Sequence, residues 1–209
     1  MVQRIVFLEG AIASGKSTVL DACCELENTV VVRENLEAWR ELGYPAAFYD
    51  DPVKHAWYFQ SAVLSTQQRD LVRALQSNAK TVVVERSVVS NKMFADILYE
   101  SKQISALEYS IYKVQHASAL ESAKLLCQNV RERIHVFLDV SAEACMERLR
   151  NRNGSNKDGE SAVSLDYMQK LYDKHISVFY NCINTLGPVI CLKQPSVSYA
   201  SATCVPNLA

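Results

Sequence analysis

Apolar positions along the chain fall into two kinds of run, and their alternation is the first structural signal. Five short runs are continuous and apolar, as expected for strands that are buried on both faces of a sheet. They cover residues 5–8, 29–32, 81–84, 134–138 and 189–192. Helical periodicity fills the stretches between them, at about 18–26, 55–76, 87–99, 106–126, 142–150 and 165–183. Strands that alternate with helices require crossover connections, which predicts an α/β fold with a five-stranded parallel sheet and helices on both faces.

Irregular composition marks two segments of the chain. Residues 151–164 are rich in Asn, Gly, Ser and charged side chains, a composition typical of a mobile loop. Residues 195–209 are rich in Ser and Ala, contain prolines and have no clear period. Because 209 residues fit one α/β domain, we expect a single domain over residues 1–194 with a mobile lid loop, followed by a loose tail over 195–209.

Composition and charge exclude several classes of function. The formal net charge is -1, so no basic excess favours nucleic-acid binding. No apolar run approaches the roughly 20 residues that a membrane span needs. The 7 cysteines include no C-x-x-C pair, which disfavours both a zinc ribbon and a disulfide framework. Few residues precede the first apolar run, so we expect no leader peptide and a cytoplasmic location, with no nucleic-acid or membrane partner.

The segment 10–18 carries the most specific chemistry in the chain. It matches the phosphate-loop pattern G-x-x-x-x-G-K-[ST] and lies between a predicted strand and a predicted helix. Glycines allow the sharp turn and the close approach of backbone N–H groups to a phosphate, and the following helix directs its positive end at the same anion. Lys16 can reach the β- and γ-phosphates, and Ser17 can ligate Mg²⁺. The predicted nucleotide-binding residues are Gly10, Ala11, Ala13, Ser14, Gly15, Lys16, Ser17 and Thr18.

Carboxylates follow two of the predicted strands. Glu34 comes after strand 29–32, and Glu85 and Arg86 come directly after strand 81–84. Ligands of such sheets bind beyond the carboxyl ends of the strands, so these side chains should lie beside the phosphate loop. A carboxylate within hydrogen-bond reach of an acceptor hydroxyl can take its proton. The pattern therefore predicts Glu34 as a general base, with Glu85 and Arg86 handling Mg²⁺ and negative charge.

Other phosphate-loop proteins fit the sequence less well. A GTPase switch would need an N-K-x-D segment, but Asn91-Lys92 is followed by Met93-Phe94, and no D-x-x-G segment occurs. A nucleoside monophosphate kinase, such as a thymidylate kinase, needs extra cations for the acceptor phosphate, and only Arg86 is clearly placed for this. A non-catalytic nucleotide-binding protein should lack the catalytic carboxylates, which are present here.

In combination, these motifs resemble the deoxynucleoside kinases over about residues 4–192. Residues 34–39 match E-P-V-x-x-W with Asn35 in place of proline, 49–52 and 59–61 match the substrate helix region, 85–87 match E-R-S, and 94–95 with 98–101 continue that motif. The absence of a zinc ribbon separates the chain from the other thymidine kinase class. The resemblance implies a P-loop kinase fold and ATP-dependent phosphorylation of a deoxynucleoside 5′-hydroxyl for nucleotide salvage. It also implies Mg²⁺ and a homodimer formed through the helices at about 87–99 and 106–126.

The resemblance implies roles for the residues near the phosphates. Glu34 is the expected general base on the 5′-hydroxyl, and Arg86 is expected to hold the same oxygen. Glu85 is expected to bind Mg²⁺ alongside Ser17. Asp139 ends the strand 134–138 like a Walker B aspartate, but the family handles Mg²⁺ elsewhere, so we interpret it as a strand-end residue.

Further residues are implied in nucleoside binding. Gln60 is expected to contact the base edge through its amide, which suits either thymine or cytosine. Phe94 is expected to stack on the base, Trp39 to wall the pocket and Tyr49 to bind the 3′-hydroxyl. Val63, one turn after Gln60, would narrow the pocket.

Substrate choice is implied by two further positions. Deoxycytidine kinases carry an Arg and an Asp that read the base edge, and the matching positions here are Gln67 and Asn91. Neither residue is charged, which does not support strict deoxycytidine or purine specificity. We therefore expect a pyrimidine-preferring or broad enzyme, with thymidine and deoxycytidine as leading substrates.

The lid loop is expected to supply arginines to the transferring phosphoryl group, where positive charge is needed. Arg148 and Arg152 are four residues apart and share a helix face, while Arg150 points elsewhere. We favour Arg148 and Arg152. A family glutamate in this loop reaches the sugar 3′-hydroxyl. Counting back from the next helix gives Glu160 for it, whereas counting forward from Arg152 gives a position nearer Lys157 or Asp158, and we prefer Glu160.

Overall fold

The computed structural model describes residues 2–151 and 163–193. The predicted lid residues Arg152 and Glu160 and the predicted tail 195–209 lie outside this part of the chain. Strands β1 (Arg4–Glu9), β2 (Thr29–Val32), β3 (Thr81–Glu85), β4 (Glu132–Asp139) and β5 (Val189–Lys193) form one sheet. All pairs are parallel and the order is β2-β3-β1-β4-β5, which confirms the predicted five-stranded parallel sheet.

The helices follow the predicted ranges closely, with one exception. They are α1 (Lys16–Cys24), α2 (Leu36–Glu41), α3 (Tyr44–Asp50), α4 (Pro52–Leu75), α5 (Val88–Glu100), α6 (Ala106–Cys127), α7 (Ala142–Asn151) and α8 (Leu165–Tyr180). The exception is the pair α2 and α3, which the periodicity did not predict. Gly43, with φ +76°, separates these two short helices, and each is too brief to show a helical period. In residues 2–151 and 163–193, no helix combines the length and apolar character that crossing a bilayer requires.

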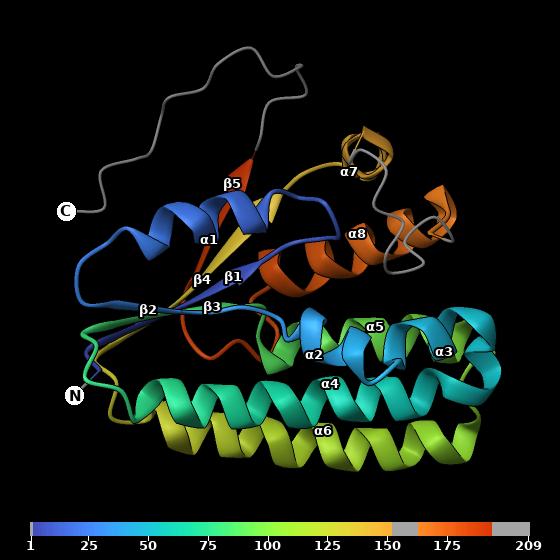
Figure 1. Ribbon diagram of the computed structural model, residues 1–209, viewed down its shortest axis with the longest axis horizontal. Helices are drawn as coiled ribbons and strands as arrows, with labels where there is room; N and C mark the ends of the chain where they lie inside the picture. Colours follow the sequence, from blue (N-terminus) through green and yellow to red (C-terminus); the bar gives the residue numbers. More distant parts are fainter. Residues whose placement is uncertain (1, 152–162, 194–209) are drawn as a thin grey trace.

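Helices cover both faces of the sheet, because alternate side chains of each strand point to opposite sides. Ile5 and Phe7 of β1 pack in the core beneath α4, α5 and α6, whereas Leu8 packs with Leu20 of α1 on the other face. Figure 1 shows α1 on one side of the strands and the long helices α4 and α6 side by side on the other. The continuous apolar runs in the sequence reflect this burial on two faces.

Capping side chains fix the starts of two of the helices that carry the site. Asp51 accepts a hydrogen bond from the Lys54 N–H at the start of α4. Ser87 caps α5 by accepting from the Val89 N–H, and it forms a capping box with Ser90. Such caps satisfy N–H groups that the first helical turn leaves without partners. The Ser87 cap places the start of α5, and with it Arg86, at the carboxyl end of β3.

Candidate active site

The phosphate loop connects β1 to α1 and has the backbone shape that its glycines allow. Gly10 has φ +149° and Gly15 has φ +101°. A Cβ atom on Gly10 would lie 2.6 Å from the Ser14 Oγ, so no larger residue fits there without displacement. The first turn of α1 carries no acidic side chain, and no side chain caps it. Its N–H groups therefore remain available for an anion, as ATP binding requires.

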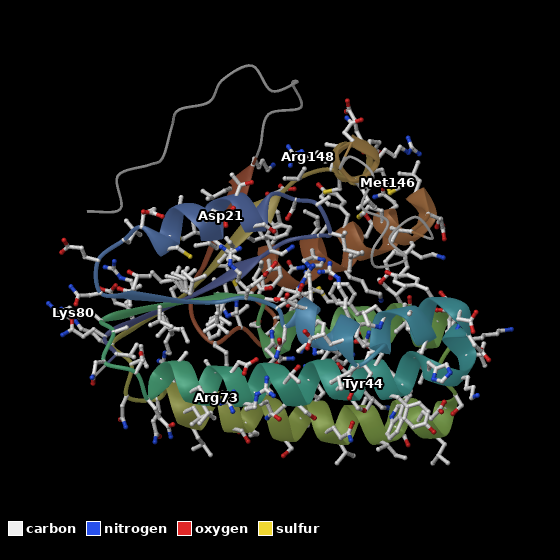
Figure 2. All side chains as sticks on the ribbon, viewed as in Figure 1. Asp21, Tyr44, Arg73, Lys80, Met146 and Arg148 are labelled. Carbon is white, nitrogen blue, oxygen red and sulfur yellow. The ribbon has the colours of Figure 1, made fainter. Side chains whose placement is uncertain are left out.

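Cationic side chains surround this loop. Lys16 Nζ donates to the Ala11 carbonyl at 2.9 Å, and Arg86 Nη1 donates to the Gly10 carbonyl at 2.6 Å. Arg148 Nη1 donates to the Ser14 carbonyl at 3.1 Å, and Figure 2 shows this residue between α7 and the start of α1. The predicted phosphate-contacting residues within the described ranges thus meet at one place.

Burial changes the protonation of the loop lysine. Lys16 is 5% exposed. Burial, together with the nearby charge of Arg86, lowers the pKa of Lys16 to about 8, although Glu34 and Glu85 act in the opposite direction. The ammonium group therefore titrates above neutral pH but below its ordinary range, and a phosphate beside it would favour the charged form.

Glu34 and Arg86 form an ion pair at the edge of the sheet. Glu34 Oε1 lies 2.8 Å from Arg86 Nε, and the Glu34 N–H donates to Glu85 Oε2 at 3.2 Å. Burial raises the pKa of Glu34 above its ordinary value; Arg86 opposes that rise and Glu85 adds to it. A carboxylate with a raised pKa is a stronger base, which suits proton abstraction from a hydroxyl.

Arg86 adopts an unusual backbone conformation. Its φ is +61°, in the left-handed region that costs a non-glycine residue roughly 1–2 kcal/mol. The Arg86 N–H donates to the Leu8 carbonyl at 2.9 Å, and its guanidinium group lies 4.8 Å from the centre of the Phe94 ring. These contacts, together with the hydrogen bond to the Gly10 carbonyl, hold the strained Arg86 in a single orientation at the wall of a cavity.

A cavity of about 180 Å³ extends from the phosphate loop into the space between α2, α3, α4 and α5. It is lined by these predicted substrate residues: Glu34, Trp39, Tyr49, Gln60, Val63, Arg86, Asn91 and Phe94. Trp39 is held by a hydrogen bond from its Nε1 to Thr66 Oγ1 at 3.2 Å. Gln60 is 7% exposed. The Gln60 amide has no hydrogen-bond partner among the described residues, so it is available to a ligand.

Gln67 is the predicted substrate residue that the structure places differently. It lies behind Asn91, whose Nδ2 donates to Gln67 Oε1 at 2.6 Å. Gln67 lines a smaller neighbouring cavity together with Thr66 and Asp70. Any effect of Gln67 on a ligand in the larger cavity would therefore pass through Asn91.

The donor groups near the loop fit Mg²⁺. Ser17 and Glu85 both line the large cavity beside Lys16. Within residues 2–151 and 163–193, no group of three or more His, Cys, Asp or Glu side chains forms a metal cage. Mg²⁺ is usually held by one or two carboxylates together with substrate phosphates rather than by such a cage. Asp139 serves another purpose, because it accepts hydrogen bonds from Tyr172 at 3.0 Å and Tyr180 at 2.6 Å.

A buried acid and histidine lie directly below the loop. His135 Nδ1 is 3.2 Å from Glu9 Oε1, and both side chains are fully buried. His135 Nε2 accepts from the Leu186 N–H at 3.1 Å, so the proton sits on Nδ1 and the imidazole is a donor to Glu9. Burial by itself would raise the pKa of Glu9, but the contact with His135 outweighs it and lowers that pKa. Glu9 is therefore a fixed negative charge next to Gly10.

Sequence reasoning missed several residues that line the cavity. Tyr167 enters it from α8, and burial raises the pKa of its hydroxyl well above the ordinary value, with Tyr49 adding to the rise. Pro45 and Phe48 enter it from α3. The sequence signal for Tyr167 was its position in the first turn of a predicted helix that follows the irregular loop. The α3 residues had no signal, since that helix was not predicted.

Comparisons with known proteins agree with this geometry. A family model described as deoxynucleoside kinase matches residues 6–202. The chain is 31% identical over 171 residues to a probable deoxycytidine kinase of fowlpox virus, covering 81% of this chain and 69% of the relative. It is 30% identical over 193 residues to a deoxyadenosine kinase of Dictyostelium discoideum, covering 88% and 70%. It is 28% identical over 171 residues to a deoxyguanosine kinase of the same organism, covering 80% and 56%.

The family match extends over most of the chain, and the parallel sheet, the phosphate loop and the Glu34–Arg86 pair are arranged as a phosphotransferase needs. The family implies ATP as the phosphate donor, and the N–H groups at the start of α1, which no side chain caps, fit that donor. The chain belongs to the deoxynucleoside kinase family.

Proposed function

We propose that this protein transfers the γ-phosphate of ATP to the 5′-hydroxyl of a deoxynucleoside, with thymidine and deoxycytidine as leading substrates or as members of a broader set. One observation carries the proposal. A single cavity joins the phosphate loop at Lys16 to an aromatic, amide-lined pocket at Phe94 and Gln60, with the Glu34–Arg86 pair between them. An acceptor in that pocket would place its hydroxyl next to both the base and the phosphate loop.

Glu34 is the proposed general base for the acceptor hydroxyl. Its carboxylate takes the 5′ proton as the oxygen attacks the γ-phosphorus and the bond from that phosphorus to the β–γ bridging oxygen breaks, releasing ADP. The raised pKa of Glu34 makes the proton transfer more favourable. Arg86 orients Glu34 and neutralises charge on the attacking oxygen. Lys16 and Arg148 stabilise the phosphates, because the protein contributes mainly positioning and electrostatics to phosphoryl transfer.

Ser17 and Glu85 are the proposed Mg²⁺ ligands. The ion, when bound, neutralises charge on the ATP phosphates. Arg152 and Glu160, the further lid residues proposed for the phosphates and the 3′-hydroxyl, lie outside the described residues.

Shape and polarity of the pocket support a pyrimidine. Phe94 offers a ring face for stacking, and Trp39, fixed by its bond to Thr66, forms a wall. Val63 reaches into the same cavity and narrows it. Gln60 supplies both a donor and an acceptor for the base edge, and Tyr49 is proposed to bind the 3′-hydroxyl. The relatives' names include deoxycytidine, deoxyadenosine and deoxyguanosine kinases, so a broader substrate range remains within the proposal.

The decisive experiment is a panel of acceptors with radiolabelled ATP and Mg²⁺. The panel contains thymidine, deoxycytidine, deoxyadenosine, deoxyguanosine and thymidine monophosphate. We expect product with thymidine or deoxycytidine and none with the monophosphate. Product from the monophosphate alone would overturn the proposed acceptor in favour of a thymidylate kinase. The described cations that line the cavity, Lys16 and Arg86, are already engaged by the loop and by Glu34, which disfavours a phosphorylated acceptor.

We also propose a homodimer, through a pair of helices that differs from the expected one. The structure buries most of α5, the helix expected to contribute to the interface. Exposed apolar residues instead lie on α4 and α6, which pack side by side (Figure 1). They are Val53, Tyr58, Leu107, Ile111, Val114 and Leu125. Light scattering checks this proposal. We expect the wild type to be a dimer and the Val114→Lys variant to be a monomer. A monomeric wild type would contradict the proposal.

A further inference from the structure

Two neutral amides are layered at the wall of the base pocket. Asn91 of α5 lines the large cavity and is 2% exposed. Gln67 of α4 lies behind it and lines the smaller cavity on the far side. The pair is joined by one hydrogen bond, from Asn91 Nδ2 to Gln67 Oε1, at 2.6 Å.

No other group fixes the direction of this hydrogen bond. Within the described residues, neither Asn91 Oδ1 nor Gln67 Nε2 has a further hydrogen-bond partner. Three carboxylates line the small cavity, and each has a partner. Asp70 is engaged by Arg69 at 2.9 and 3.1 Å, Glu34 lies 2.8 Å from Arg86, and Glu85 Oε2 accepts from the Glu34 N–H at 3.2 Å. Within the described residues no hydrogen bond joins these carboxylates to Asn91 or Gln67, so no charged partner fixes the orientation of the two amide groups.

The pair therefore has two arrangements with the same number of internal hydrogen bonds. In the one described, Asn91 directs its oxygen, which only accepts, toward the cavity. A half-turn of both amide groups makes Gln67 Nε2 the donor and Asn91 Oδ1 the acceptor, and Asn91 then directs its NH₂ group toward the cavity. The exchange needs no movement of the backbone and leaves no buried polar atom worse satisfied.

We propose that Gln67 is a positioning residue that lets Asn91 present either an acceptor or a donor to the nucleobase. This inference rests on the proposed function. An amino base, cytosine or adenine, selects the arrangement with the Asn91 oxygen outward. A keto base, thymine or guanine, selects the arrangement with the Asn91 nitrogen outward. The enzyme then takes both kinds of base because the amide pair reverses at no cost in hydrogen bonds.

Locking the pair should convert this tolerance into a preference. Gln67→Glu places an acceptor-only group behind Asn91, which holds Asn91 Nδ2 inward and its oxygen toward the cavity. Gln67→Lys places a donor-only group there, which holds the Asn91 oxygen inward and its nitrogen toward the cavity. The two changes should shift selectivity in opposite directions.

The experiment measures kcat/KM for deoxycytidine and for thymidine at pH 8, where an introduced glutamate is ionised. We expect the deoxycytidine-to-thymidine ratio to rise roughly tenfold in Gln67→Glu and to fall roughly tenfold in Gln67→Lys, since one mismatched buried hydrogen bond has about that effect. Gln68, the next residue of α4, is half-buried and lines neither cavity. The matched controls Gln68→Glu and Gln68→Lys should leave the ratio at the wild-type value.

A merely structural role for Gln67 would lower kcat/KM for both nucleosides and leave their ratio unchanged in both variants. That result, or a shift in the same direction in both, would overturn the positioning role while the proposed kinase activity of the wild type stands. A wild-type enzyme that neither binds nor phosphorylates either nucleoside would instead reject the proposed function, and this inference with it. Calorimetric binding of each nucleoside to each variant supplies the ratio for any variant whose turnover is too slow to measure.

Discussion

The two ends of the cavity are built from different chemistry. At the phosphate end, Lys16, Arg86 and Arg148 each donate to backbone carbonyls of one loop, and the backbone itself is held in left-handed conformations. At the base end, Gln60, Asn91 and Gln67 are neutral amides, and most of their polar atoms have no partner among the described residues. Charge and strain fix the end of the cavity that is proposed to transfer the phosphate, whereas neutral amides form the end that is proposed to accept different bases.

Glu34→Gln should have the largest effect on the phosphate end. The amide cannot take the 5′ proton, so we expect kcat to fall by roughly 10²–10⁴ while ATP affinity changes little. Steady-state kinetics and ATP binding by calorimetry measure the two quantities. Glu37→Gln, at an exposed position on α2, is the control and should behave as wild type. An active Glu34→Gln enzyme would remove the base assignment.

Gly10→Ala tests whether the backbone geometry of the loop is essential. The added Cβ would lie 2.6 Å from Ser14 Oγ and 3.2 Å from the Leu138 carbonyl, at a φ of +149°. We expect ATP affinity to fall about a hundredfold, because the amides that bind phosphate must shift, an effect comparable to misplacing a reacting group. Gly43→Ala is the control: its Cβ meets nothing within 4 Å, so it reports the backbone strain alone. Equal losses of ATP affinity in the two variants would contradict the steric argument.

Lys16 should make ATP binding sensitive to alkaline pH. The group must be protonated to stabilise phosphate, and burial lowers its pKa to about 8. The charged fraction therefore falls as pH rises through 8, and the KM for ATP should rise roughly tenfold between pH 7 and pH 9. The KM for the nucleoside, measured over the same range, is the internal control. A flat ATP profile to pH 10 would show that the lysine keeps its ordinary pKa.

Gln60→Ala should have the smallest effect and act on the base end alone. Loss of one two-point amide contact should raise the KM for thymidine and deoxycytidine by about tenfold or less, with the KM for ATP unchanged. Discrimination between the two nucleosides should also weaken, and competition assays with both substrates measure this. Unchanged kinetics for both nucleosides would remove Gln60 from the base-binding site.

The sequence predicted the phosphate end better than the base end, for a physical reason. The apolar run at residues 5–8 is continuous because β1 is buried on both faces. The loop that follows carries a specific motif, the phosphate-loop pattern. Helical periodicity tells which residues share a face, but it does not tell how deep a side chain lies. The family resemblance could therefore indicate Gln67 as a pocket residue, but no sequence pattern placed it behind Asn91.

Short elements were the other source of error. The helices α2 and α3 are separated at Gly43, and neither is long enough to complete a recognisable apolar pattern. As a result, Pro45 and Phe48 were missed, although both line the cavity. Tyr167 was missed for a different reason: the sequence shows that it lies at the start of a helix after the irregular loop, but not that this helix start faces the cavity.

The backbone conformation and the side-chain contacts of Arg86 together restrict which residues can replace it. Its left-handed backbone suits glycine or asparagine best, yet neither carries the guanidinium group that contacts both Gly10 and Glu34. Lysine would keep the charge but offers no planar fork to make both contacts. In a saturation mutagenesis screen for kinase activity, every replacement of Arg86 should abolish phosphorylation of the nucleoside. Libraries at positions 60, 63, 67 and 91 should instead yield active enzymes with an altered choice of nucleoside. Variants with altered nucleoside choice are therefore best sought at positions 60, 63, 67 and 91.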